Sequence, residues 1–387
     1  MENFLFDLGI VLVGTAVLSF LAVLLKQPII IAYIACGVLV GPWGLGWIKH
    51  PDFIEMASLI GITLLLFLAG LCLHPQKLIK LFKQTVLVTF GNALASFIIA
   101  FLIARFYSFG LSDSICIGLA LMFSSTILAV KLLPTTTLHQ QRMGAICIGV
   151  LILQDLLAVS VLAFLSCFDT SHSPFLCFGM LLVKLFAFIG ALVLFEQFVL
   201  RKIMMRIERL HELLFILGLA WCFGIASLSK SLGLFYETGA FFAGVVLARH
   251  PISFFISEKL KPLRDFFLVL FFFTLGAKLN LLVVKGVFLQ ALLMTLIFIM
   301  VKPWLFEKFF KSSGESPAFA REIGVRLGQM SEFALLIATM AFASGYIGTQ
   351  ASQLIQLVTI LTFIASSYIV ISRYPTPIGT SERLTKD

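Results

Sequence analysis

Gln154 and Asp155 are the residues of this chain most suited to chemistry, because they lie within the apolar stretch 150-VLILQDLLAVSVLAF-164. A carboxylate at the centre of a bilayer costs about 2.5–3.5 kcal/mol on insertion scales, so such a residue is expected to have a function. Burial favours the neutral form of a carboxyl group, whereas a bound cation favours the ionised form. Asp155 is therefore predicted to hold either a proton or a cation. A structural neutral acid or a buried ion pair is the alternative.

Gln154 supplies a side-chain carbonyl oxygen, a neutral ligand that suits a weakly held monovalent cation. Neighbouring residues of a helix point about 100° apart, so Gln154 and Asp155 need not face the same ion. The structural alternative for Gln154 is a hydrogen bond between helices.

Three consecutive hydroxyl residues, Ser124, Ser125 and Thr126, lie in another apolar stretch. Hydroxyl groups can bend a helix by bonding back to its carbonyl groups, and they can equally line an ion path. Both interpretations stay open.

Charged residues also occur in the later apolar stretches. Lys302 precedes Pro303, which kinks a helix and leaves a carbonyl group unpaired. Lys302 could pair with Asp155, stabilise a broken helix end, or extend toward the membrane surface. Arg326 and Glu332 suggest a local or interhelical charge network. The charged residues of the stretch 175–199 are interpreted as structural.

Composition places these residues in a membrane. The chain has 387 residues, of which 60% are hydrophobic and 12% are charged, and a soluble protein carries about 25% charged residues. About 13 apolar stretches are long enough to span a bilayer as helices. The predicted fold is therefore an all-α polytopic membrane protein, with spans at 4–25, 28–47, 53–73, 85–107, 113–133, 144–166, 175–199, 211–229, 231–249, 264–282, 285–306, 319–343 and 352–372.

The net charge of +9 comes from short connectors, which argues against nucleic-acid binding. Connectors after odd-numbered spans are basic, and they hold roughly 20 of the 28 Lys and Arg residues. Basic connectors mark the cytoplasmic side, which predicts an outside N-terminus and a cytoplasmic C-terminus. The seven cysteines are scattered singly without metal-ligand spacing, so they are interpreted as small buried hydrophobic residues.

The order of spans suggests inverted repeats, a common architecture of secondary transporters. An offset of seven spans pairs each early helix with a later helix of opposite direction. Two paired spans contain polar stretches where a helix could be broken, namely 123-FSSTILAV-130 and 328-GQMSEFAL-335. Small residues in 35-ACGVLVGPWGLG-46, 67-FLAGL-71 and 239-GAFFAGVVLA-248 predict close helix packing.

Seven motifs in order resemble the second monovalent cation:proton antiporter family, of the potassium-efflux or sodium–proton exchanger type. The motifs are 27-QPIIIAYIACGVLVGP-42, 64-LLLFLAGLCLHP-75, 124-SSTILAVKLL-133, 151-LILQDLLAV-159, 237-ETGAFFAGVVLA-248, 263-LRDFFLVLFFFTLGAKL-279 and 328-GQMSEFALL-336. The pair Gln-Asp at 154–155 is similar to that of the potassium-efflux branch.

This resemblance implies a transmembrane exchanger domain over 1–373 and a short cytoplasmic tail over 374–387. A core with two crossed broken helices is expected at 85–166 and 285–372, a dimer-forming scaffold at 4–73 and 211–282, and a linker span at 175–199. It also implies elevator-type transport by a homodimer. By position, Asp155 and Gln154 match the family's ion- and proton-binding pair, and Lys302 matches the core-helix lysine of related exchangers. The first broken helix is matched by Ser124, Ser125 and Thr126. The second broken helix is matched by Gln329 and Glu332.

The sequence departs from the family pattern at Cys72, where Glu is common, at Ser331, where Gly is common, and at Arg326, where a small or apolar residue is usual. The efflux branch usually carries a cytoplasmic nucleotide-binding domain with glutathione-linked control. This chain is expected to lack that domain, so glutathione control is not carried over. A separate cytoplasmic regulatory subunit is a further possible partner.

The expected function is a non-enzymatic exchange of K⁺ or Na⁺ for H⁺ in the bacterial inner membrane, without a bound cofactor. Electroneutral 1:1 exchange is the default expectation, unless Lys302 also gives up a proton. The alternatives are an uncoupled, channel-like cation permease, the membrane subunit of a regulated potassium-efflux system, a sensor or receptor, and a membrane enzyme. The enzyme is the weakest of these, because the sequence shows no nucleophile with a nearby base and no cluster with metal-ligand spacing.

Overall fold

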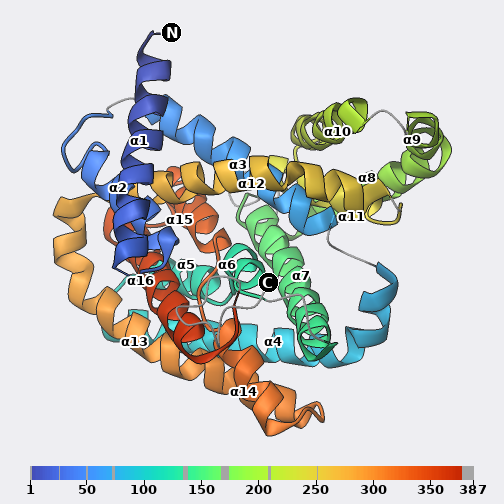
Figure 1. The fold of residues 1–387 in the computed structure, drawn as a ribbon. Coiled ribbons are helices and arrows are strands. Elements are labelled where there is room, and N and C mark those ends of the chain that lie inside the picture. Colours follow the sequence, from blue (N-terminus) through green and yellow to red (C-terminus); the bar gives the residue numbers. More distant parts are fainter. Residues whose placement is uncertain are drawn as a thin grey trace. The chain divides into compact units, whose positions relative to one another are not determined.

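The computed structural model describes residues 2–25, 27–48, 51–71, 75–133, 138–166, 174–207, 211–250 and 252–376, and these residues form helices and short connections without a β-strand (Figure 1). They divide into two compact units. The first contains residues 1–49, 80–162 and 275–387, and the second contains 50–79 and 163–274. The predicted tail from residue 377 onward, the connector 167–173 and Cys72 lie outside the described residues.

The first unit contains every predicted site residue, either in a helix or in a break between helices. Its helices are α1 (Glu2–Leu24), α2 (Ile29–Val40), most of α4 (Pro75–Phe106), α5 (Leu111–Leu121), α6 (Thr126–Lys131), most of α7 (Leu138–Ser166), α13 (Leu281–Ser312), α14 (Pro317–Arg326), α15 (Phe333–Ala343) and α16 (Thr349–Arg373). The second unit holds α3 (Pro51–Leu71), α8 (Pro174–Phe195), the π-helix η1 (Glu196–Leu200), α9 (Arg201–Ile207), α10 (His211–Ser231), α11 (Tyr236–Leu247) and most of α12 (Ile252–Ala277).

Each predicted span range contains a helix, and the two ranges predicted to be broken each contain two. The range 113–133 holds α5 and α6, separated by residues 122–125. The range 319–343 holds α14 and α15, separated by residues 327–332. Among the described residues, seven helices are long and apolar enough to cross a bilayer, and shorter apolar helices accompany them. The prediction of an all-α membrane fold with two broken helices is confirmed.

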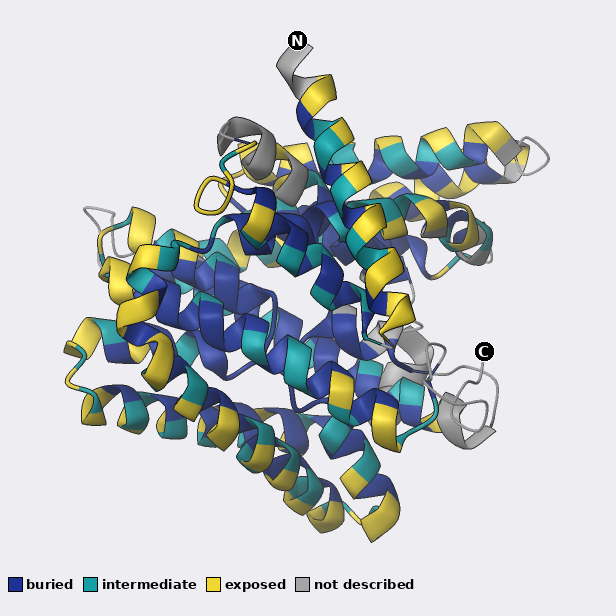
Figure 2. Ribbon diagram, turned by 60° about the vertical axis from the view of Figure 1, so that its left-hand side comes forward, coloured by how far each residue is buried: buried dark blue, intermediate teal, exposed yellow. Residues whose placement is uncertain are grey.

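The distribution of polar residues is that of a membrane protein. Large apolar side chains lie on outer helix faces, such as Phe106 at 82% exposure, Leu5 at 74% and Met300 at 72%. Lys302 and Gln154, in contrast, are completely buried. Figure 2 shows exposed residues along the outer faces of the helices and buried residues on their inner faces. Lipid is the solvent that allows this arrangement, because exposed apolar surface of this extent would be costly in water.

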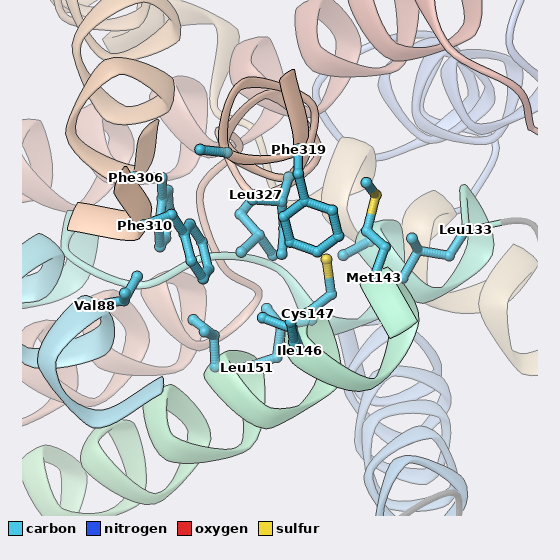
Figure 3. Packing of buried hydrophobic residues seen from close by; sticks show 14 residues of the cluster. Val88, Leu133, Met143, Ile146, Cys147, Leu151, Phe306, Phe310, Phe319 and Leu327 are labelled. Atoms are coloured by element: carbon cyan, nitrogen blue, oxygen red, sulfur yellow. The ribbon is translucent and has the colours of Figure 1, made fainter. Parts of the chain in front are cut away.

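An apolar cluster holds the helices of the first unit together (Figure 3). It joins α4, α6, α7, α13 and α14, and its members are Val88, Ala129, Leu133, Met143, Ile146, Cys147, Val150, Leu151, Phe306, Phe310, Phe319, Ala320, Ile323 and Leu327. Cys147 contributes a buried free thiol, as do Cys36, Cys116 and Cys222 elsewhere. For these four cysteines the interpretation as small hydrophobic residues is confirmed.

Glycines bring α3 and α11 of the second unit into close contact. A Cβ atom on Gly244 would stand 2.1 Å from the carbonyl oxygen of Phe67, and one on Gly70 would stand 2.3 Å from that of Phe241. Both glycines come from the small-residue stretches noted in the sequence, and the prediction of close packing there is confirmed.

Gly244→Ala is expected to destabilise the protein by about 1–3 kcal/mol, because the added methyl group must push α3 and α11 apart. Thermal unfolding in detergent micelles would measure the effect. Gly286→Ala on α13 is the control, since a Cβ atom there meets nothing within 4 Å. Equal unfolding temperatures for the two variants would contradict the close packing.

Candidate functional site

A single lysine connects the two helix breaks. The ammonium group of Lys302, on α13, donates to the carbonyl oxygen of Phe123 in the first break and to that of Gln329, 3.3 Å away, in the second. The Lys302 side chain is completely buried, which excludes extension toward the membrane surface. Backbone carbonyl groups in a helix break have no partner within a helix and need another donor where they are buried. Lys302 therefore supplies a hydrogen bond and positive charge to one carbonyl group in each break.

The side chain of Gln329 adds a second connection between the breaks. Its amide nitrogen donates to the carbonyl oxygen of Ser125 at 3.3 Å, and its oxygen accepts from the hydroxyl group of Ser366 on α16 at 3.1 Å. The backbone nitrogen of Met330 donates to the hydroxyl group of Thr362, also on α16, at 3.2 Å. Helix α16 thus satisfies polar groups that the second break exposes.

Asp155 lies on α7 with 2% exposure and faces the start of α6. The hydroxyl group of Thr126 donates to its two carboxylate oxygens, at 3.1 and 3.0 Å. Among the described residues the ion pairs join other side chains, and none includes Asp155. Within the described part of the chain, the carboxylate is therefore buried with a hydroxyl group as its hydrogen-bond donor and no cationic side chain paired with it.

Gln154 holds the first break against α7. Its carbonyl oxygen accepts from the backbone nitrogen of Ser124 at 2.8 Å, and that oxygen retains a second lone pair. The amide nitrogen of Gln154 and the hydroxyl group of Ser124 are buried without a partner among the described residues. Polar atoms buried in this way ordinarily have a partner, so they mark a place where water or an ion would be bound.

The two breaks share a local pattern at the start of their second helices. The hydroxyl group of Ser125 accepts from the backbone nitrogen of Leu128, and that of Ser331 accepts from Phe333. Ser125 thus caps α6, whereas Ser331 bonds to the first residue of α15, one position before the N-cap residue Glu332. Glu332 follows Ser331, is 2% exposed, and lies close enough to Asp155 for the two carboxyl groups to interact electrostatically.

Arg326 is fully buried at the end of α14. Its guanidinium group pairs with Glu322 at 2.8 Å and donates to the carbonyl oxygens of Leu132 at 2.8 Å and Pro375 at 2.9 Å. It also lies over the ring of Tyr374, 5.5 Å from the centroid. Arg326 thus connects the ends of α6 and α14 to the segment that follows α16, and the structure gives it no contact with Asp155.

The breaks, Asp155 and Lys302 form one connected site, and sequence reasoning identified most of its side chains. It did not identify Ser366 and Thr362, although the polar residues 359, 362 and 366 recur at helical spacing along α16. The backbone carbonyl groups that bind Lys302 carried no sequence signal. Among the described residues, no group of three or more His, Cys, Asp or Glu side chains is arranged to hold a metal ion.

A helical membrane bundle with two connected helix breaks beside a buried carboxylate is the architecture of a secondary transporter. The profile of the family described as sodium/hydrogen exchanger, transmembrane, matches residues 9–371. The chain therefore belongs to the sodium/hydrogen exchanger family.

Similar proteins include two curated bacterial transporters. The chain is 28% identical over 348 residues to the iron transporter MagA of Paramagnetospirillum magneticum, a match that covers 89% of this chain and 80% of MagA. It is 29% identical over 374 residues to the glutathione-regulated potassium-efflux system protein KefC of Cronobacter sakazakii, covering 94% of this chain and 59% of KefC. The match thus spans about three fifths of KefC and corresponds to the transmembrane part of the family.

Solved structures show the same fold. The sodium proton antiporter MjNhaP1 from Methanocaldococcus jannaschii at pH 8 matches with a TM-score of 0.70 and 18% identity, covering 95% of both chains. At this identity the likeness establishes the helical architecture, and the chemistry has to be argued from the residues described above.

Lys302→Met is expected to lower the free energy of unfolding by about 2 kcal/mol, because hydrogen bonds to a charged group are lost and two buried carbonyl groups lose their donor. Thermal unfolding in detergent would measure it. Lys308→Met on the same helix is the matched control, since Lys308 is exposed over the ring of Trp304. If Lys302→Met unfolds at the same temperature as the control, Lys302 does not hold the breaks together.

Proposed function

We propose that this chain is a secondary-active antiporter that exchanges a monovalent cation, K⁺ or Na⁺, for H⁺ at Asp155. The observation that carries the proposal is the burial of the Asp155 carboxylate beside a helix break, with the Thr126 hydroxyl group as donor and no ion pair among the described residues. Such a carboxylate needs a positive partner, and either a proton or a cation can serve. Binding of one excludes the other.

The proposed coupling of cation flux to proton flux follows from the free-energy cost of moving an unpaired charge through the membrane. An ionised Asp155 without a cation would cross the membrane barrier at high cost, because an unpaired charge is poorly tolerated there. Only the protonated site and the cation-loaded site then change sides. In the proposed cycle the core of the transporter moves as an elevator against the rest of the protein. With Lys302 committed to two carbonyl groups, Asp155 carries the exchanged proton and the stoichiometry is 1:1.

Oxygen atoms near Asp155 would complete the coordination of the cation. The Thr126 and Ser124 hydroxyl groups and the free lone pair of Gln154 are the proposed ligands, with Ser125, Gln329 and Glu332 shaping the surroundings. Neutral and carboxylate oxygens suit hard monovalent cations. KefC is named for potassium and MjNhaP1 for sodium, so both ions are proposed substrates, with K⁺ first because KefC has the higher identity.

Assembly and location are also proposals. We place the chain in the inner membrane as a homodimer, with the N-terminus outside and the C-terminus in the cytoplasm, as the basic connectors suggest. A separate cytoplasmic regulatory subunit is compatible with the naming of KefC as part of a regulated efflux system. Arg326 contacts the segment after α16, so it is the residue through which such a subunit would reach the core.

The test is proton flux in proteoliposomes that hold a pH gradient. K⁺, Na⁺, Li⁺ and, because MagA is named an iron transporter, Fe²⁺ are added in turn. The intact chain is expected to dissipate the gradient with K⁺ or Na⁺, and Asp155→Asn is expected to lose this response. A cation flux that moves no protons would support a channel-like permease. Equal exchange by Asp155→Asn would place the site elsewhere.

Thr126 offers a graded test of the same site. Thr126→Val removes the hydroxyl donor while keeping the shape, and is expected to slow exchange roughly 10- to 100-fold, the effect of losing a hydrogen bond to a charged group. Thr126→Ser keeps the hydroxyl group and is expected to exchange at a rate close to that of the parent. Equally slow valine and serine variants would show that the methyl group, and not the hydrogen bond, is required.

A further inference from the structure

A large apolar cavity separates α8 from α10 within the second unit. Its volume is about 1000 Å³. Small residues line both walls, namely Ala187 and Ala191 on α8 and Ala220 and Gly224 on α10. Membrane helices with small residues at this spacing usually pack against each other closely. Here, however, a Cβ atom on Gly224 would meet nothing within 4 Å. The two walls touch where the rings of Phe195 and Trp221 stack, with 5.7 Å between their centroids, and the small residues leave open space beside this contact.

The cavity is elongated along the helices. Its lining extends from Lys184 to Ile203, which corresponds to about 28 Å of helix at 1.5 Å per residue. This length is close to the hydrocarbon thickness of a bilayer, about 30 Å. Phe188, Leu192 and Trp221 are among the residues along it. An apolar channel of this length and direction fits extended acyl chains.

The π-helix η1 and the residues beside it contribute to this cavity and also to a polar pocket. In a π-helix, residues five positions apart are neighbours. Phe195 and Leu200, five apart, line the apolar cavity, whereas Glu196 and Arg201, also five apart, line a second pocket of about 270 Å³. π-Helical turns are rare and often occur at functional sites. This one places an apolar cavity and a charged pocket at the same point of the chain.

The polar pocket has an excess of positive charge. Arg249, Gln197 and His250 complete its lining, so two arginines face one glutamate. Arg201 and Arg249 are exposed, and α9 continues with the exposed basic residues Lys202 and Arg206. Arginine binds phosphate through paired hydrogen bonds. A phosphate group at one end and acyl chains along the rest are the two parts of a phospholipid.

We propose that the cavity between α8 and α10 binds an anionic phospholipid, with its acyl chains along the cavity and its phosphate at Arg201 and Arg249. The basic end belongs to a connector predicted to face the cytoplasm, where membranes carry anionic lipids. The site lies on other residues than Asp155 and does not depend on the exchange activity. It assigns a binding role to the span 175–199, whose charged residues the sequence had suggested to be structural.

The test measures lipid binding directly, so it is independent of transport. The purified chain is titrated with phosphatidylglycerol or phosphatidylcholine, and bound lipid is counted by native mass spectrometry. The parent is expected to retain phosphatidylglycerol preferentially. The double variant R201Q/R249Q is expected to bind it roughly 30-fold more weakly, at the usual contribution of a basic residue near anionic lipid. R264Q, which changes an arginine of the second unit outside both pockets, is the matched control.

A second variant pair tests the cavity itself. Gly224→Leu fills the cavity and is expected to lose bound phosphatidylglycerol, while Gly190→Leu on α8 also enters open space but does not line the cavity. Circular dichroism confirms that each variant is folded. The proposal is overturned if both lipids bind equally well, or if R201Q/R249Q and Gly224→Leu bind phosphatidylglycerol like their controls. In those cases the cavity holds unselected lipid or a second copy of the chain.

Discussion

The contact of Lys302 with two backbone carbonyl groups is the interaction on which the rest of the site depends. A broken helix exposes backbone groups that lipid cannot satisfy, and each costs several kcal/mol if left alone. One ammonium group serves both breaks, since it bonds to Phe123 and Gln329 at once. The side chain of Gln329 and the Thr362 hydroxyl group of α16 each pair with one further backbone group of the breaks. The breaks are thus stabilised by side chains from within the first unit.

Because Lys302 bonds to these carbonyl groups, the carboxylate of Asp155 stays available for a proton or a transported cation. If Lys302 were paired with Asp155, the carboxylate would already have a permanent cation, and a transported ion would have to displace it. With the ammonium group engaged elsewhere, the carboxylate has a hydroxyl donor and a nearby second carboxyl group, Glu332. A carboxylate in these surroundings favours a positive partner that can leave, namely a proton or a cation. The contacts of Lys302 with the two carbonyl groups therefore support the proposed exchange, because they keep its ammonium group from pairing with Asp155.

Much of the fold followed from the sequence, because hydrophobic stretches of bilayer length are a strong signal. The broken helices could also be predicted, since polar residues such as Ser125 and Glu332 interrupt apolar runs at matching places. The hydrogen bonds within the site could not be predicted from the sequence. The choice of Lys302 between Asp155 and the carbonyl groups depends on how α13 packs, and the partners of Arg326 come from three separate segments. The cavity beside η1 was also hidden, because a π-helix has no clear sequence pattern.

Exchange at Asp155 requires that a proton and a cation compete for its carboxylate, and calorimetry of the detergent-purified chain measures this competition. Cation binding is titrated in buffers of different ionisation enthalpy, which reports the protons released per cation bound. We expect that K⁺ or Na⁺ releases protons on binding, that the affinity for the cation falls as the pH is lowered, and that Asp155→Asn loses both cation binding and proton release. Cation binding without proton release at every pH, or release that persists in Asp155→Asn, would contradict it.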